Sequence, residues 1–240
     1  MANGLSDLGV SGLLASQRAL AVTGRNISNV NTEGFSRQEV ALSTEAAQQR
    51  AAGAIGGGVT VDGVNRVVDQ FAERQLTAST SASAQQDRLS GLLADLGDAL
   101  GGVDGTLSKS LDRVFSSAQD FANEPGSDTT RRVLLEDAAG LAREFNRTDT
   151  RLSDLRRGAT EELRAEIGSV HELARVVAGL HERIEVARGS GDQPNELLDQ
   201  RRQVINRIAE RVSVSTFDQP GSGIGLAIGN GQALAWMAAN

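Results

Sequence analysis

The sequence predicts a mainly α-helical protein: an elongated bundle of long coiled-coil-like helices, with an inserted β-hairpin and the start of a β-rich domain at its C-terminal end. Apolar residues make up 39% of the 240 residues, but aromatic residues only 3%, a composition that suits helices packed by Ala and Leu. Apolar positions recur at spacings of three and four over long stretches, as on one face of a helix. From residue 212 onward the pattern changes to the alternation that is typical of strands.

The first segment, from Leu5 to Asn29, is predicted to be a helix with two lines of residues on adjoining faces. One line contains Leu5, Leu8, Gly12, Ala15, Ala19, Val22, Asn26 and Asn29. The other has heptad spacing and contains Leu13, Leu20 and Ile27. Such spacing keeps a stripe facing a neighbouring helix, while each glycine weakens the isolated helix by about 1 kcal/mol relative to Ala. We expect a segment that is disordered alone and helical once packed against a partner outside this chain. The alternative is an ordinary amphipathic helix of the same domain.

The next segment, Asn26–Gln38, reads Asn-Ile-Ser-Asn-Val-Asn-Thr-Glu-Gly-Phe-Ser-Arg-Gln and is predicted to be a hinge between helical and strand-like sequence. Its distinctive residues are Asn26, Asn29, Asn31, Gly34, Phe35 and Arg37. Asparagine side chains bond nearby backbone groups and so compete with helix continuation. The glycine permits positive φ where the chain turns, and the phenylalanine anchors the new direction.

The middle of the chain is predicted to begin with a hairpin and continue as helices. The hairpin pairs Gln38–Ser43 with Val59–Val64 around a loop at Gly53–Gly58. Helical periodicity then covers about 66–100, 108–123 and 128–188. A last helix of about 60 residues would span roughly 90 Å, which predicts a rod-shaped body. A break near Gly158 or Gly168 is the alternative.

The C-terminal part is predicted to contain one more helix and several strands. Asn195 is placed to cap a helix over Glu196–Arg211. Strand-like stretches follow at 212–217, 221–228 and 232–236, the last two joined by Gly-Asn-Gly. The predicted domains are therefore 1–33, an assembly-coupled helix and hinge; 34–211, a helical rod with its hairpin at about 36–64; and 212–240, the beginning of a β-rich outer domain.

Two stretches resemble a known family. Residues 26–38 resemble the Asn-rich signature near the N-terminus of bacterial flagellar axial proteins, and the ending Gly-Phe-Ser-Arg-Gln is most similar to the hook-associated protein 1 family of hook–filament junction proteins. The run Asn-Glu-Leu-Leu-Asp-Gln-Arg at 195–201 resembles a second element of that family, in the expected order. The residues of this second element are Asn195, Leu197, Leu198, Asp199 and Arg201.

The resemblance implies a structural adaptor at the junction of hook and filament, assembled as a ring or tube through coiled-coil and lateral contacts. It implies self-association, contacts with the hook protein and with the next junction protein, and an export apparatus with its chaperone. The implied location is extracellular, in the flagellum, reached without a cleaved signal peptide. Family members return to a C-terminal helix that is missing here, so we expect a fragment or an incomplete gene model.

Composition and motifs argue against other functions. The net charge is −7 and no basic stripe occurs, so nucleic acid is not an expected partner. The chain has no cysteine, and no apolar run reaches membrane-spanning length. His171 and His181 lie ten residues apart and on different helix faces, so they cannot chelate one metal. We therefore expect no metal, no cofactor and no enzyme activity. The alternatives are another axial protein (a second junction protein or a flagellin-like subunit) and, less favoured, a helical ligand-binding module or enzyme.

Overall fold

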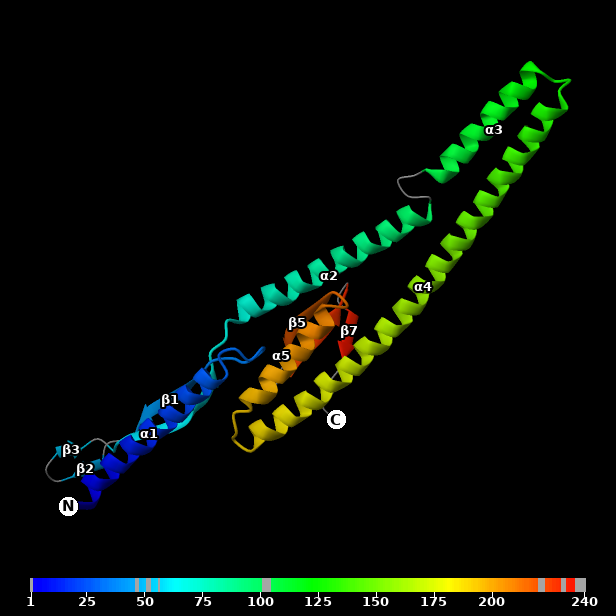
Figure 1. Cartoon of the computed structure of the whole chain (residues 1–240). Helices are drawn as coiled ribbons and strands as arrows, with labels where there is room; N and C mark the ends of the chain where they lie inside the picture. The colour runs from blue at the N-terminus through cyan, green and yellow to red at the C-terminus, as the bar shows by residue number, and fades with distance from the viewer. Residues whose placement is uncertain are drawn as a thin grey trace. The chain divides into compact units, whose positions relative to one another are not determined.

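The computed structural model describes residues 2–45, 48–50, 53–55, 57–100, 105–219, 223–229 and 232–235, and it confirms the mainly α-helical class. Within these residues the helices are α1 (Ala2–Ser28), α2 (Gln70–Ala99), α3 (Thr106–Asn123), α4 (Asp128–Gly189) and α5 (Asn195–Ala209). The strands are β1 (Gln38–Thr44), β2 (Gln48–Arg50), β3 (Gly53–Ile55), β4 (Val59–Arg66), β5 (Val214–Gln219), β6 (Gly223–Ile228) and β7 (Gln232–Ala235). Figure 1 shows these elements in chain order. They form two compact units: the terminal unit, residues 1–82 and 171–240, and the middle unit, residues 83–170.

The predicted hairpin is present and is longer than expected. β1 pairs with β4 in antiparallel register, from Gln38 opposite Arg66 to Thr44 opposite Val59. The prediction of a loop over 53–58 is wrong at 53–55, because β3 pairs there with β2 and extends the hairpin as a second two-stranded ribbon. Backbone pairing does not require the alternating side chains on which the sequence-based assignment relied.

Helix α1 packs against this hairpin, side by side with β1 and β4 (Figure 1). Ala15 and Val22, on its first predicted line, are buried. The prediction that this line lacks a partner within the chain is therefore wrong. The small side chains along it let a strand pair approach closely, and the turn after α1 returns the chain directly onto the helix. The spacing identified a contact face, but it could not identify what covers that face.

The core of the terminal unit lies where α4, α5 and the C-terminal strands pack together. Ile184 of α4 and Ile208 of α5 are fully buried, and Leu226 of β6 is almost fully buried. The strands form an antiparallel sheet in the order β5-β6-β7. The three predicted strand segments are thus present, although the turn residues Asn230 and Gly231 and the predicted strand end Trp236 lie outside the described residues.

The middle unit consists of helical segments, and ion pairs join two of its helices. Helix α4 is continuous, so the alternative of a break at Gly158 or Gly168 does not occur. Arg88 of α2 pairs with Glu162 and, at 2.7 Å, with Glu166 of α4. Hydrogen bonding to Glu166, followed by the charge of Glu162, raises the pKa of Arg88. These pairs are exposed, so they contribute little stability and mainly set which helix faces meet.

Candidate assembly joint

The two motifs that carry the family resemblance contact each other directly. Asp199 of α5 accepts hydrogen bonds from the Ser36 backbone N–H at 3.1 Å and from the Ser36 hydroxyl at 2.6 Å. Both residues are buried, and they are 163 positions apart in the chain. A hydroxyl-to-carboxylate distance of this length is typical of a strong, charge-assisted hydrogen bond. Helix α5 therefore holds the end of the hinge at a defined point.

A network of buried and partly buried charges surrounds this contact. Arg66, at the end of β4, places its Nε 3.0 Å from Asp199, and their side chains are only 11% and 10% exposed. Arg202 of α5 lies 3.5 Å from Asp199 and 2.5 Å from Glu73 of α2, and Glu73 also lies 3.6 Å from Arg66. Burial lowers the pKa of Arg66, the nearby Arg202 lowers it further, and Asp199 and Glu73 oppose the shift. An arginine nevertheless stays charged in proteins, so the network holds two cations between two carboxylates.

The tight turn of the hinge is also held by α5. Gly34 has φ 76°, a left-handed conformation that favours glycine. Arg202 donates to the Gly34 carbonyl at 2.7 Å, and Gln203 donates to the Glu33 carbonyl at 2.6 Å. A Cβ at Gly34 would lie only 1.8 to 2.5 Å from atoms of the Gln203 side chain. Glycine is thus required here both by the backbone conformation and by the close approach of α5.

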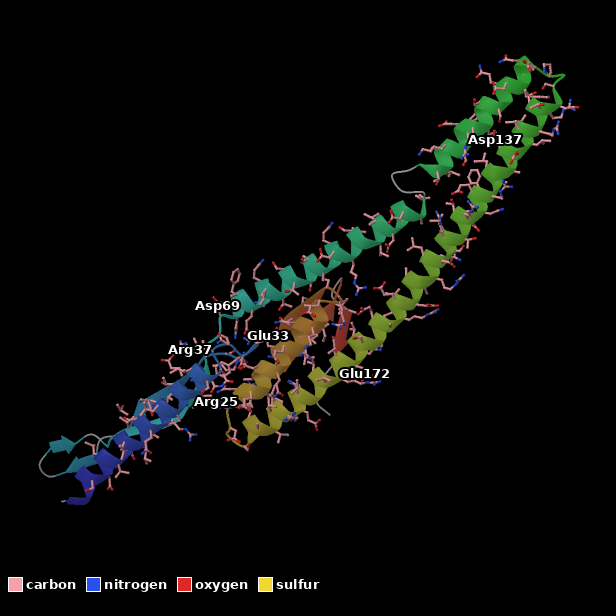
Figure 2. The ribbon with its side chains drawn as sticks, in the orientation of Figure 1. Arg25, Glu33, Arg37, Asp69, Asp137 and Glu172 are labelled. Atoms are coloured by element: carbon pink, nitrogen blue, oxygen red, sulfur yellow. The ribbon has the colours of Figure 1, made fainter. Side chains whose placement is uncertain are left out.

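The asparagines of the hinge have different roles. The Asn26 side chain donates to the Gln38 carbonyl at 2.8 Å and accepts from the Gln38 N–H at 2.9 Å, which joins the end of α1 to the start of β1. Asn29 donates to the Arg25 carbonyl at 2.9 Å and accepts from the Thr32 hydroxyl at 3.2 Å, so it ends the helix locally. Asn31 is exposed. Figure 2 labels Arg25, Glu33 and Arg37 along this segment.

The second motif differs from its predicted local role at one residue. Asn195 does not cap α5, because Pro194 occupies the cap position and α5 begins at Asn195 itself. The Asn195 side chain instead donates to the Val64 carbonyl of β4. This tertiary hydrogen bond ties the Asn195 side chain to the hairpin through its Nδ2, whereas a cap would use its Oδ1 as an acceptor. Farther along α5, Leu197 and Leu198 are half-buried, and Arg201 is buried.

We name this arrangement the hinge joint: residues 26–38 together with Arg66, Glu73, Asp199, Arg202 and Gln203. Phe35 is half-buried within it, whereas Arg37 is exposed and lies 3.7 Å from exposed Glu39, a pairing of little energetic weight. Sequence reasoning did not identify Ser36, Arg66, Glu73, Arg202 or Gln203 as site residues. Ser36 and Arg202 lie within or beside the recognised motifs, but no local pattern marks Arg66 or Glu73 as partners.

Along α1, the two predicted lines have different environments. On the first line Ala15 and Val22 are buried, Gly12 and Ala19 are half-buried, and Leu8 is exposed. The side chain of Leu5 lies outside the described residues. On the second line Leu13, Leu20 and Ile27 are 60%, 72% and 68% exposed. One face of α1 is therefore packed on the hairpin, and the adjoining line presents large apolar side chains to solvent.

The described residues contain no group of three or more His, Asp or Glu side chains placed to hold a metal ion. In the part of the chain that the structure describes, no helix combines the length and the apolar character needed to cross a membrane. The chemistry of the hinge joint is that of a fixed structural contact: the Asp199 carboxylate faces guanidinium and hydroxyl donors, and the Glu73 carboxylate faces two guanidinium groups.

The family models give a consistent result. Residues 93–236 match the model described as the flagellar hook-associated protein FlgK helical domain, and residues 7–35 match the model of the flagella basal body rod protein. The first match covers the end of α2, helices α3, α4 and α5, and strands β5, β6 and β7. The second covers most of α1 and the turn that follows it.

Known relatives and a solved structure agree with these matches. The chain is 32% identical over 234 residues to flagellar hook-associated protein 1 of Salmonella typhimurium, covering 94% of this chain and 41% of that protein. It is 26% identical over 227 residues to the protein of the same name from Bacillus subtilis, covering 91% of this chain and 45% of the relative. The structure of the flagellar hook junction protein FlgK from Burkholderia pseudomallei matches 68% of this chain and 29% of its own, with a TM-score of 0.62 at 22% identity, which supports the fold.

The chain thus spans less than half the length of the curated relatives that it matches. The matched family is one of structural flagellar proteins rather than enzymes. The match over 93–236, more than half of the chain, shows that this chain belongs to the flagellar hook-associated protein FlgK family.

Proposed function

We propose that this chain is a structural subunit of the hook–filament junction that assembles with copies of itself into a ring or tube. The observation that carries the proposal is the exposed heptad line Leu13, Leu20 and Ile27 on a helix whose other face is already packed. Transfer of such a side chain from water into an interface contributes about 1 to 2 kcal/mol. Repeated head-to-tail contacts of this kind build rings or helical tubes.

The proposal assigns a role to each part of the chain. Residues 1–33 provide the assembly helix and the hinge, 34–211 the helical body with its hairpin, and 212–240 the start of an outer β domain. The hinge joint sets the direction in which α1 leaves the body. The proposed partners are the hook protein, the next junction protein, and the flagellar export apparatus with its chaperone. The proposed location is extracellular, in the flagellum.

The test places Leu13→Ser, Leu20→Ser and Ile27→Ser together in the chromosomal gene of the host. We expect cells that make hooks but no filaments, as expected also for deletion of the gene, because the assembly face has become polar. The matched control is Leu135→Ser, Leu163→Ser and Val186→Ser, three similarly exposed apolar side chains of α4, which should leave filaments in place. Normal filaments on the α1 variant would contradict the assigned face, and normal filaments on the deletion strain would contradict the junction role.

A further inference from the structure

A cavity of about 600 Å³ lies within the terminal unit, next to the hinge joint. Its walls come from the end of β4, the start of α2, the α4–α5 connection, α5 itself, and strands β5 and β6. Guanidinium groups dominate its charge: Arg66, Arg74, Arg188, Arg201 and Arg202 all line it. The acidic residues among its lining are Glu73 and Asp192. The volume falls in the range of pockets that hold organic ligands.

Arg201 differs from the other cations of this wall. Arg201 is only 6% exposed, and no described residue accepts a hydrogen bond from its Nη1. Burial lowers the pKa of Arg201, and the charges of Arg188 and Arg66 lower it further; Glu185 opposes the shift but already lies 3.7 Å from Arg188. A buried donor without an acceptor is costly. The cavity therefore contains a cation whose pairing is incomplete.

Another part of the cavity lining is apolar. Phe217 of β5 is 44% exposed, Ile224 of β6 is half-buried, and Ile205 of α5 is buried. Phe217 pairs across the sheet with Gly225, and its ring occupies the space where a side chain at Gly225 would stand. A single inorganic anion would leave this apolar lining and most of the volume unused. A ligand that combines a carboxylate with an apolar side chain would use both the charged and the apolar parts of the lining.

We propose that this cavity binds an acidic peptide segment of a partner protein, with a carboxylate on Arg201 and a neighbouring apolar side chain on Phe217. The planar guanidinium can hold a carboxylate through two parallel hydrogen bonds. Such a bond also satisfies the donor that the folded chain leaves unpaired. This inference stands on the cavity alone, so its test can fail without affecting the test of the junction role.

The experiment measures binding of the full chain to a short fluorescein-labelled peptide with Glu-Leu at its centre, by fluorescence polarisation. Its Gln-Leu counterpart and inorganic phosphate, used as a competitor, are measured in parallel. We expect the Glu-Leu peptide to bind about tenfold or more tightly than the Gln-Leu peptide, the gain typical of a hydrogen-bonded charge. Arg201→Met should lose this preference, and Arg175→Met, an exposed arginine of α4 outside the cavity lining, should retain it.

Equal binding of the two peptides, or unchanged preference in Arg201→Met, would overturn the proposal. Phosphate that binds while neither peptide does would also overturn it, in favour of a free-anion site. Phosphate that displaces the Glu-Leu peptide would support the oxyanion contact at Arg201. If Arg201→Met fails to fold, the comparison of the two peptides on the unaltered chain still decides the question.

Discussion

The sharpest consequence of the hinge joint concerns Asp199. The substitution Asp199→Asn keeps the size of the side chain and removes its charge. The wild-type carboxylate accepts two hydrogen bonds from Ser36 and lies 3.0 Å from Arg66. An amide can still accept on one side, but its NH2 group faces a donor on the other. Glu73 would then be the one carboxylate of the network left to pair with both Arg66 and Arg202.

The expected cost follows from these contacts. Hydrogen bonds to a charged group contribute about 1.5 to 3 kcal/mol each, and breaking a buried ion pair costs about 3 to 5 kcal/mol. Glu73 retains part of the pairing, and it is 31% exposed, so the lower end of this range applies. We expect Asp199→Asn to lower the free energy of opening of the hinge joint by about 3 kcal/mol. That corresponds to a rise of about 100-fold in the opening equilibrium.

Hydrogen exchange read by mass spectrometry is the appropriate assay, because the chain has two compact units and need not unfold in one step. The informative peptides cover residues 33–38, which include the Ser36 amide. The matched control is Asp62→Asn, since Asp62 also accepts from a serine hydroxyl, Ser43 at 2.7 Å, but in an exposed position. Faster exchange at the hinge joint in Asp199→Asn alone would support the reasoning. Equal effects of the two substitutions would refute it.

Three further outcomes are expected. Ile184→Ala should destabilise the terminal unit by about 2 to 4 kcal/mol in urea unfolding, because Ile184 is fully buried, whereas Val186→Ala, at an exposed residue of the same helix, should cost far less. Gly34→Ala should lower the melting temperature through backbone strain and the clash with Gln203; adding Gln203→Ala should remove the clash but not the strain, so a full recovery would contradict the assigned φ. In limited proteolysis of the monomer, trypsin should cleave after exposed Arg18 before any site in α5, because α1 packs on the hairpin by one face only; an α1 as protected as α5 would contradict this order.

Prediction from sequence succeeded where the signal is local. The spacing of apolar residues over 128–188 predicted α4 almost to its ends, because a long amphipathic helix repeats its pattern many times. The strand pair at 38–43 and 59–64 was also identified, since alternation and glycine mark such segments. In both cases each residue's environment depends mainly on its neighbours in sequence.

Prediction failed where distant groups compete for a side chain or a surface. Asn195 has the chemistry of a helix cap, yet the Val64 carbonyl uses its amide. The line through Ala15 and Val22 has coiled-coil spacing, yet a strand pair covers it. Arg66 and Glu73 carry no local signature of pairing. These two residues become partners because β4, α2 and α5 meet in the folded chain, and no local sequence pattern predicts that meeting.

The composition of the hinge joint indicates what it contributes. A buried ion pair adds little net stability, because removing its charges from water costs about as much as their attraction returns. Asp199 with Arg66 and Arg202 is therefore expected to specify geometry more than stability. The turn as folded satisfies the Ser36 donors, the Gly34 carbonyl and the Asp199 carboxylate at the same time. A purely apolar contact has no preferred direction, so it would allow the turn to shift along α5. The network instead fixes the C-terminal end of α1, and we propose that it thereby sets where the exposed line Leu13, Leu20 and Ile27 is presented to another subunit.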